Sequence, residues 1–178
     1  MDRRFAAKLV RLSILAVFVA GITPTLPASA VVPASPSLTI NFRGEPEAST
    51  AFFEMKAGGT RTFELHIRND GDTPDRFSLD IALDQVIFPA FCCGGSPLSW
   101  ARFDIAVYKA DGTNVSQKIE AGTFSTKELA LGQAQHLTLV VHLASDALAR
   151  RKTWNITAAP LSDPSSSDTV QLAIKRRL

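Results

Sequence analysis

The two cysteines of the chain, Cys92 and Cys93, are neighbours in the sequence FCCGGSPLSW of residues 91–100. Cysteines can supply a nucleophile, a metal ligand or a disulfide. Because both lie in one dipeptide, no disulfide within the chain can join distant strands. Adjacent Cα atoms are about 3.8 Å apart, whereas disulfides usually span about 4.4–6.8 Å, so a bridge between neighbours is strained. We predict this strained vicinal disulfide, eased by Gly94 and Gly95. Bridges to a second chain and free or metal-binding thiols stay open as alternatives.

The segment around the cysteines, residues 86–100, is unusually apolar for a loop. It reads VIFPAFCCGGSPLSW and interrupts the alternation of polar and apolar residues on either side. Two interpretations are open, since loops usually run over the surface. The loop packs over the end of the core, or part of it is an exposed apolar patch that binds a partner. The candidate binding residues are Phe88, Phe91, Cys92, Cys93 and Trp100.

Three histidines and one aspartate-rich segment are candidate metal ligands. His136 and His142 are six residues apart in one alternating stretch and so share a face, whereas His66 lies on another stretch. Zinc would need imidazoles that converge on one ion, and nothing in the sequence brings His66 to the other two. The segment NDGDTPD, residues 69–75, has enough carboxylates for calcium, but its Asp-Gly and Thr-Pro pairs already account for a turn. We expect no metal site and no cofactor.

Motifs of enzymes are missing from the sequence. It contains no G-x-S-x-G, no H-E-x-x-H and no glycine-rich phosphate loop. A cysteine nucleophile would need a histidine beside Cys92 or Cys93 in space, which the sequence does not indicate. The sequence therefore predicts a protein that is not an enzyme.

Alternating polar and apolar residues predict strands through most of the chain. Such alternation places one face of a strand on a core and the other in water. Turn segments rich in Gly, Pro, Asn and Asp separate the strands. The predicted strands cover residues 38–42, 62–68, 77–84, 103–108, 136–143, 153–158 and 170–175, with a short one around Phe124 and a short helix at Ser145–Arg151. This pattern predicts an all-β, immunoglobulin-like antiparallel β-sandwich of about 7–9 strands that forms a single domain over residues 38–178.

The first 30 residues have the pattern of a cleaved signal peptide. Four basic residues precede an apolar run of about 11 residues. This run is too short to span a bilayer as a helix. The tripeptide Ala28-Ser29-Ala30, which has the pattern of a cleavage site, follows it. We expect cleavage after Ala30, a Pro/Ser-rich linker over residues 31–37, and no transmembrane span in the mature chain. Cleavage removes four of 19 basic and one of 17 acidic residues, which leaves a net charge of about −1. No basic surface for nucleic acid is expected.

Three segments resemble secreted immunoglobulin-like modules of bacterial and archaeal surface proteins. They are KAGGTRTFELHIRNDGDTPDRFSLDI (Lys56–Ile81), WARFDIAVYKADGTNV (Trp100–Val115) and LALGQAQHLTLVVHLASDALARRKTWNITAAPLSDPSSSDTVQL (Leu129–Leu172). The resemblance covers most of Thr50–Ile174, and it rests on turn glycines and strand hydrophobics. A weaker resemblance is to camelysin-type proteins of the biofilm matrix, from which the chain departs by a further strand after SDPSSSD. Both resemblances imply a fold more than a function.

The sequence favours an exported, non-catalytic module with a structural or binding role at the cell surface or in the extracellular space. If the source has an outer membrane, the location is periplasmic. The expected partners are a surface or matrix protein, a glycan or another copy of the chain. Two alternatives are a self-assembling matrix subunit joined through the Cys92-Cys93 loop and a metal-binding or redox protein that uses these cysteines.

Overall fold

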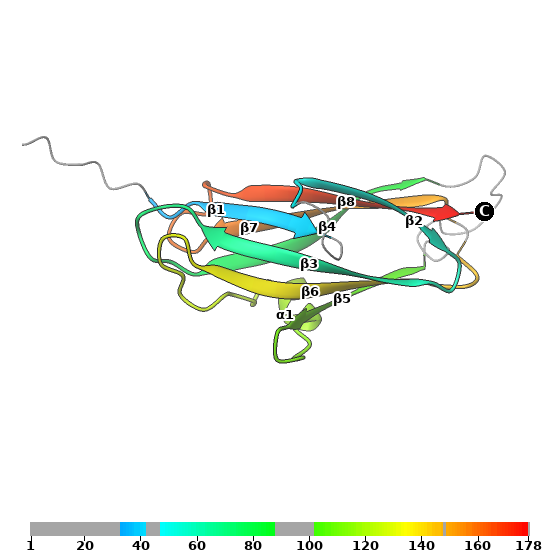
Figure 1. The fold of residues 1–178 in the computed structure, drawn as a ribbon, viewed down its shortest axis with the longest axis horizontal. Helices are drawn as coiled ribbons and strands as arrows, with labels where there is room; N and C mark the ends of the chain where they lie inside the picture. Colours follow the sequence, from blue (N-terminus) through cyan, green and yellow to red (C-terminus); the bar gives the residue numbers. More distant parts are fainter. Residues whose placement is uncertain (1–32, 42–46, 88–101, 148, 178) are drawn as a thin grey trace, which may run out of the picture. The chain divides into compact units, whose positions relative to one another are not determined.

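The computed structural model describes residues 33–41, 47–87, 102–147 and 149–177, which form two four-stranded sheets packed face to face (Figure 1). One sheet has the order β1-β3-β6-β5 and the other the order β2-β8-β7-β4. The strands of the first sheet are β1 (Pro36–Asn41), β3 (Thr60–Asn69), β6 (Ala134–Leu143) and β5 (Phe103–Lys109). Those of the second are β2 (Thr50–Lys56), β8 (Asp168–Arg177), β7 (Arg151–Pro160) and β4 (Phe77–Ile87). A short helix, α1 (Ser116–Glu120), follows β5.

The chain changes sheets between its first two strands. β1 pairs antiparallel with β3, whereas β2 pairs in parallel with β8 at the edge of the other sheet. All the other strand pairs are antiparallel. The all-β, immunoglobulin-like sandwich expected from the sequence is therefore confirmed, with eight strands in the described residues and one parallel pair that the alternation did not predict.

The core lies between the two sheets and follows the alternation of the strands. On β3, Phe63, Leu65 and Ile67 are fully buried, while the residues between them face outward. Fully buried residues of β6, β7 and β8 face the same space: Leu139, Val141, Ile156, Ala158, Val170, Leu172 and Ile174. Burial of large apolar side chains contributes about 1.5–3 kcal/mol each, so this double layer is the main source of stability.

Three local predictions were wrong. β2 was missed because Phe52 and Phe53 are adjacent, and Phe52 is 50% exposed, which hides the period of two. The described residues of Ser145–Arg151 form a turn and the start of β7 instead of the expected helix, and Ala147 and Ala149 are buried. Near Phe124 only an isolated bridge between Ser78 and Ser125 is found.

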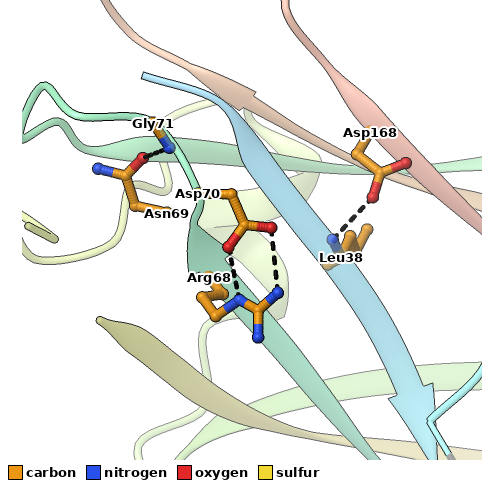
Figure 2. Close-up of polar contacts among 6 residues, drawn as sticks. All are labelled: Leu38, Arg68, Asn69, Asp70, Gly71 and Asp168. Carbon is orange, nitrogen blue, oxygen red and sulfur yellow. Dashed lines mark hydrogen bonds and ion pairs between the residues drawn. The ribbon is translucent and has the colours of Figure 1, made fainter. Parts of the chain in front are cut away.

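The turn after β3 is organised by the side chain of Asn69. Its buried Nδ2 donates to the carbonyl oxygens of Thr73 (2.9 Å) and Leu129 (2.8 Å), and its Oδ1 accepts from the N–H of Gly71 (3.0 Å). Figure 2 shows Asn69 and Gly71 beside the ion pair of Arg68 with Asp70. A Cβ at position 71 would lie 1.9 Å from the carbonyl oxygen of Pro33, so only glycine fits there. The bond to Leu129 ties the end of β3 to the segment before β6, and the N–H of Asp70 donates to the carbonyl of Ser35 (2.8 Å) in the segment before β1.

Candidate functional site: a groove between two edge strands

A groove of about 320 Å³ with both apolar and polar lining lies between β4 and β5, the last strands of the two sheets. Trp154 of β7 and Phe103 of β5 contact each other edge to face in it, with ring centroids 5.8 Å apart. Ile119 of α1 also lines the groove. The other lining residues are Asp80, Ile81, Leu83, Ile105, Val107, Ser116 and Glu120. This volume is at the lower end of the range for ligand pockets, which is about 300–1,000 Å³.

One end of the groove is closed by the segment that follows β5. The N–H of Val107 donates to Oγ of Ser116 (2.9 Å), and its carbonyl accepts from Val115 (2.8 Å). On the opposite wall, the N–H of Phe77 donates to Oγ1 of Thr126 (2.9 Å), and its carbonyl accepts from the Thr126 N–H (2.9 Å). These bonds cover the edges of β5 and β4 where residues 107 and 77 lie.

Beyond these bonds, the described residues place nothing against the two edges. Because strand backbone groups alternate in direction, those of Ile105 and Ile81 point the same way as those of Val107 and Phe77. Within the described residues no hydrogen bond reaches these outward groups of Ile105 and Ile81. Farther along β4, Leu83 is 42% exposed and Ile87 is 37% exposed. This half of the groove therefore combines apolar side chains with backbone groups that can pair with another strand.

One basic residue, Lys152, lies beside the groove where Trp154 lines it. In the β4–β7 pair, Val86 is opposite Lys152 and Ile87 is opposite Arg151. The Nζ of Lys152 lies 5.3 Å from the centre of the Trp154 ring. Burial lowers the pKa of Lys152 below its ordinary value, although the charge of Asp104 acts in the opposite direction. An acidic group that reached this part of the groove would meet a partly desolvated ammonium.

The loop predicted from the sequence as a binding site lies outside the described residues. This holds for Phe88, Phe91, Cys92, Cys93 and Trp100, and so the vicinal disulfide stays a prediction. The described strands on its two sides, β4 ending at Ile87 and β5 beginning at Phe103, are the two walls of the groove. Sequence reasoning found the segment that joins these walls but not the groove, because Trp154 and Ile119 come from distant parts of the chain.

The three histidines do not converge on one point. His66 of β3 and His136 of β6 are direct neighbours across the strand pair, whereas His142 lies opposite Thr60 and accepts or donates a hydrogen bond of 3.0 Å to its Oγ1. In the aspartate-rich turn, Asp70 pairs with Arg68 and Asp75 bonds to Ser162. Within the described part of the chain, no group of three or more His, Cys, Asp or Glu side chains could hold a metal ion.

No helix of the described residues is both long and apolar enough to cross a membrane. No protein-family model matches the chain, and no curated protein matches it in sequence.

Solved structures with a similar fold differ widely in sequence from this chain. A family 123 glycoside hydrolase from Clostridium perfringens is similar with a TM-score of 0.51 and 8% identity, over 80% of this chain and 27% of that one. PapD-like domain 7 of human CEP192 has a TM-score of 0.44 and 15% identity, over 89% and 95%. The chaperone DraB of E. coli has a TM-score of 0.36 and 14% identity, over 79% and 55%. The chain thus spans about a quarter of the glycoside hydrolase, and the similarity shows the sandwich fold alone.

Proposed function

We propose that the chain is an exported, non-catalytic immunoglobulin-like module that binds an extended segment of a partner polypeptide in the groove between β4 and β5. It acts at the cell surface or in the extracellular space, or in the periplasm if the source has an outer membrane. Export is inferred from the signal-peptide pattern of residues 1–30. The outward backbone groups of Ile81 and Ile105, which have no hydrogen-bond partner among the described residues and flank the rings of Trp154 and Phe103, are the observation that carries the binding role.

An extended peptide fits this groove better than a compact ligand does. A strand added to a sheet edge gains main-chain hydrogen bonds, and its alternate side chains enter pockets on one side. The groove offers both elements, because the outward backbone groups of Ile81 and Ile105 flank the apolar surface of Trp154 and Phe103. The partner segment should therefore carry apolar residues at every second position.

The charge of Lys152 indicates which charged residue the partner segment should carry. Lys152 lies opposite Val86 of β4 and beside the ring of Trp154, and its amine is partly desolvated. An acidic residue at one end of the bound segment would be placed beside this cation, and charge complementarity favours such an encounter. We expect the preferred peptide to combine alternating apolar residues with a terminal Asp or Glu.

Selection from a displayed library of short linear peptides tests this function. The full-length chain is compared with Leu83→Lys in the groove and with the matched control Leu131→Lys, since Leu131 is 59% exposed in a turn away from the groove. Peptides with alternating apolar residues and an acidic end should be enriched on the wild type and on Leu131→Lys, and should bind Leu83→Lys at least tenfold more weakly. No enrichment, or equal binding to Leu83→Lys, contradicts the groove as the binding site.

Two further measurements separate the alternatives. If light scattering shows that the wild type associates with itself and Leu83→Lys does not, the occupant is another copy of the chain and the partner proposed here is wrong. If the chain recovered from the producing cell is only cytoplasmic and retains residues 1–30, export is wrong. An N-terminal sequence that begins at Val31 in the exported fraction supports it.

A further inference from the structure

His66 and His136 form a close pair on the outer face of the β1-β3-β6-β5 sheet. They are directly opposite each other in the register of β3 and β6, and their ring centroids are 4.1 Å apart at an interplanar angle of 70°. The His66 side chain is only 16% exposed, whereas His136 is exposed. The pair is separate from the groove, so the inference below does not depend on the proposed function.

The Nδ1 side of the His66 ring is held by a carboxylate. Oε1 of Glu47, in the connection between β1 and β2, lies 2.6 Å from Nδ1 of His66. An ionised carboxylate can only accept, so Nδ1 carries the proton and the lone pair of neutral His66 is on Nε2.

The Nε2 side of His66 lacks a partner. This atom is buried and makes no hydrogen bond within the described residues, and the nearest carboxylate oxygen, Oε2 of Glu64, is 3.7 Å away. A buried polar atom without a hydrogen bond costs about 1–3 kcal/mol and calls for an explanation. A histidine whose Nδ1 donates to a carboxylate and whose Nε2 is a bare acceptor has the arrangement of metal-ligating histidines.

We propose that His66 and His136 bind a divalent transition-metal ion of the zinc, nickel or copper class, with Glu47 as the residue that orients His66. Imidazole nitrogens are suited to these ions. Two nitrogens that ligate one tetrahedral ion at about 2.1 Å are about 3.4 Å apart. The ring centroids of His66 and His136 are 4.1 Å apart, so rotation of the exposed His136 ring can bring the two Nε2 atoms to this spacing. Water completes the shell of this two-histidine site.

The chain contains a matched control for this site. His142 is on the same strand and the same face as His136, six residues farther along, where it is bonded to Thr60 instead of another histidine. The variant His142→Gln removes an imidazole of the same strand but leaves the pair intact. Cys92 and Cys93 are competing ligands, so each titration is made in a Cys92→Ser, Cys93→Ser background and repeated with the cysteines present.

The experiment is a calorimetric titration of the full-length chain, without a histidine tag, with Zn²⁺ and Ni²⁺ at pH 7.5. We expect one equivalent to bind in the parent and in His142→Gln, at least tenfold weaker binding in His66→Gln and in His136→Gln, and about tenfold weaker binding in Glu47→Gln. Circular dichroism checks that every variant keeps its strand content. If the serine background does not fold, NMR of the histidine ring protons in the wild type replaces calorimetry. Zn²⁺ should then shift the signals of His66 and His136 and not those of His142.

Three results would overturn the proposal. The first is no binding in the parent, and the second is a loss in His142→Gln as large as that in His136→Gln. The third is wild-type affinity in both His66→Gln and His136→Gln, which would place the ion elsewhere.

Discussion

The backbone N–H of Leu38 donates a hydrogen bond of 2.8 Å to Oδ2 of Asp168, which joins an edge strand of one sheet to a strand of the other (Figure 2). Leu38 lies in the middle of β1, and Asp168 is the first residue of β8. The second carboxylate oxygen, Oδ1, accepts from the N–H of Thr169 (2.8 Å). One side chain thus covers an outward donor of an edge strand and fixes β1 to the opposite sheet.

Removal of this carboxylate should destabilise the sandwich. We expect Asp168→Ala to lower the free energy of unfolding by about 1–3 kcal/mol, because the Leu38 N–H loses a charged acceptor. Asp168→Asn keeps an acceptor oxygen and should lose about half as much. Urea unfolding followed by circular dichroism measures both. Equal losses in the two variants would mean that the Leu38 hydrogen bond is not the cause.

Asn69 should be among the most sensitive polar positions in the described chain. Asn69→Ala removes its hydrogen bonds to the carbonyls of Thr73 and Leu129 and to the N–H of Gly71, so we expect a loss of about 3 kcal/mol. The control is Asn114→Ala, which removes one exposed bond, to the N–H of Ser116, and should cost about 1 kcal/mol or less. The two midpoints of urea unfolding give the comparison, and similar losses would contradict the role assigned to Asn69.

The sequence predicted strands well where only one face of a strand is buried. Phe63, Leu65 and Ile67 alternate with polar residues and lie in the core as expected. The sequence did not predict β2, because the side chain of Phe52 is exposed and does not pack in the core. Its neighbours in space include the guanidinium of Arg151, 5.4 Å from the centre of the Phe52 ring. Local alternation carries no signal for such a contact.

The candidate sites depend on register, which the sequence does not reveal. His66 and His136 are 70 residues apart in the chain and meet only because β3 and β6 pair in one alignment. A shift of one residue would turn one of the two histidines to the opposite face. The groove depends in the same way on which strands lie at the sheet edges. The aspartates of residues 69–75 were visible in the sequence, but their partners Arg68 and Ser162 show that they build a turn.

Gly71 should not tolerate a side chain. A Cβ there would lie 1.9 Å from the Pro33 carbonyl oxygen and 2.8 Å from Cα of Ala34, both backbone atoms. Gly71→Ala must therefore displace the segment before β1, and we expect a loss of at least about 3 kcal/mol. At Gly112, with a φ of 80°, a Cβ has no atom within 4 Å, so Gly112→Ala should cost only the left-handed backbone, about 1–2 kcal/mol. Thermal unfolding of the two variants tests this order, and it is contradicted if Gly112→Ala is the more damaging change.

Asp75 should make the stability of the domain depend on acid. Burial raises the pKa of Asp75, but hydrogen bonds from Oγ (2.6 Å) and N–H (3.1 Å) of Ser162 and from the Arg76 N–H (2.7 Å) outweigh it and lower the pKa below its ordinary 3.8. The unfolded chain then binds the proton more readily than the folded chain does. The stabilisation by this carboxylate is complete above the unfolded pKa and is lost as the pH falls through the folded one. Urea midpoints between pH 7 and pH 3 should fall less steeply for Asp75→Asn than for the wild type. The other carboxylates with lowered pKa, such as Asp163, act equally in both proteins, so parallel curves would show that Asp75 is not a source of the acid dependence.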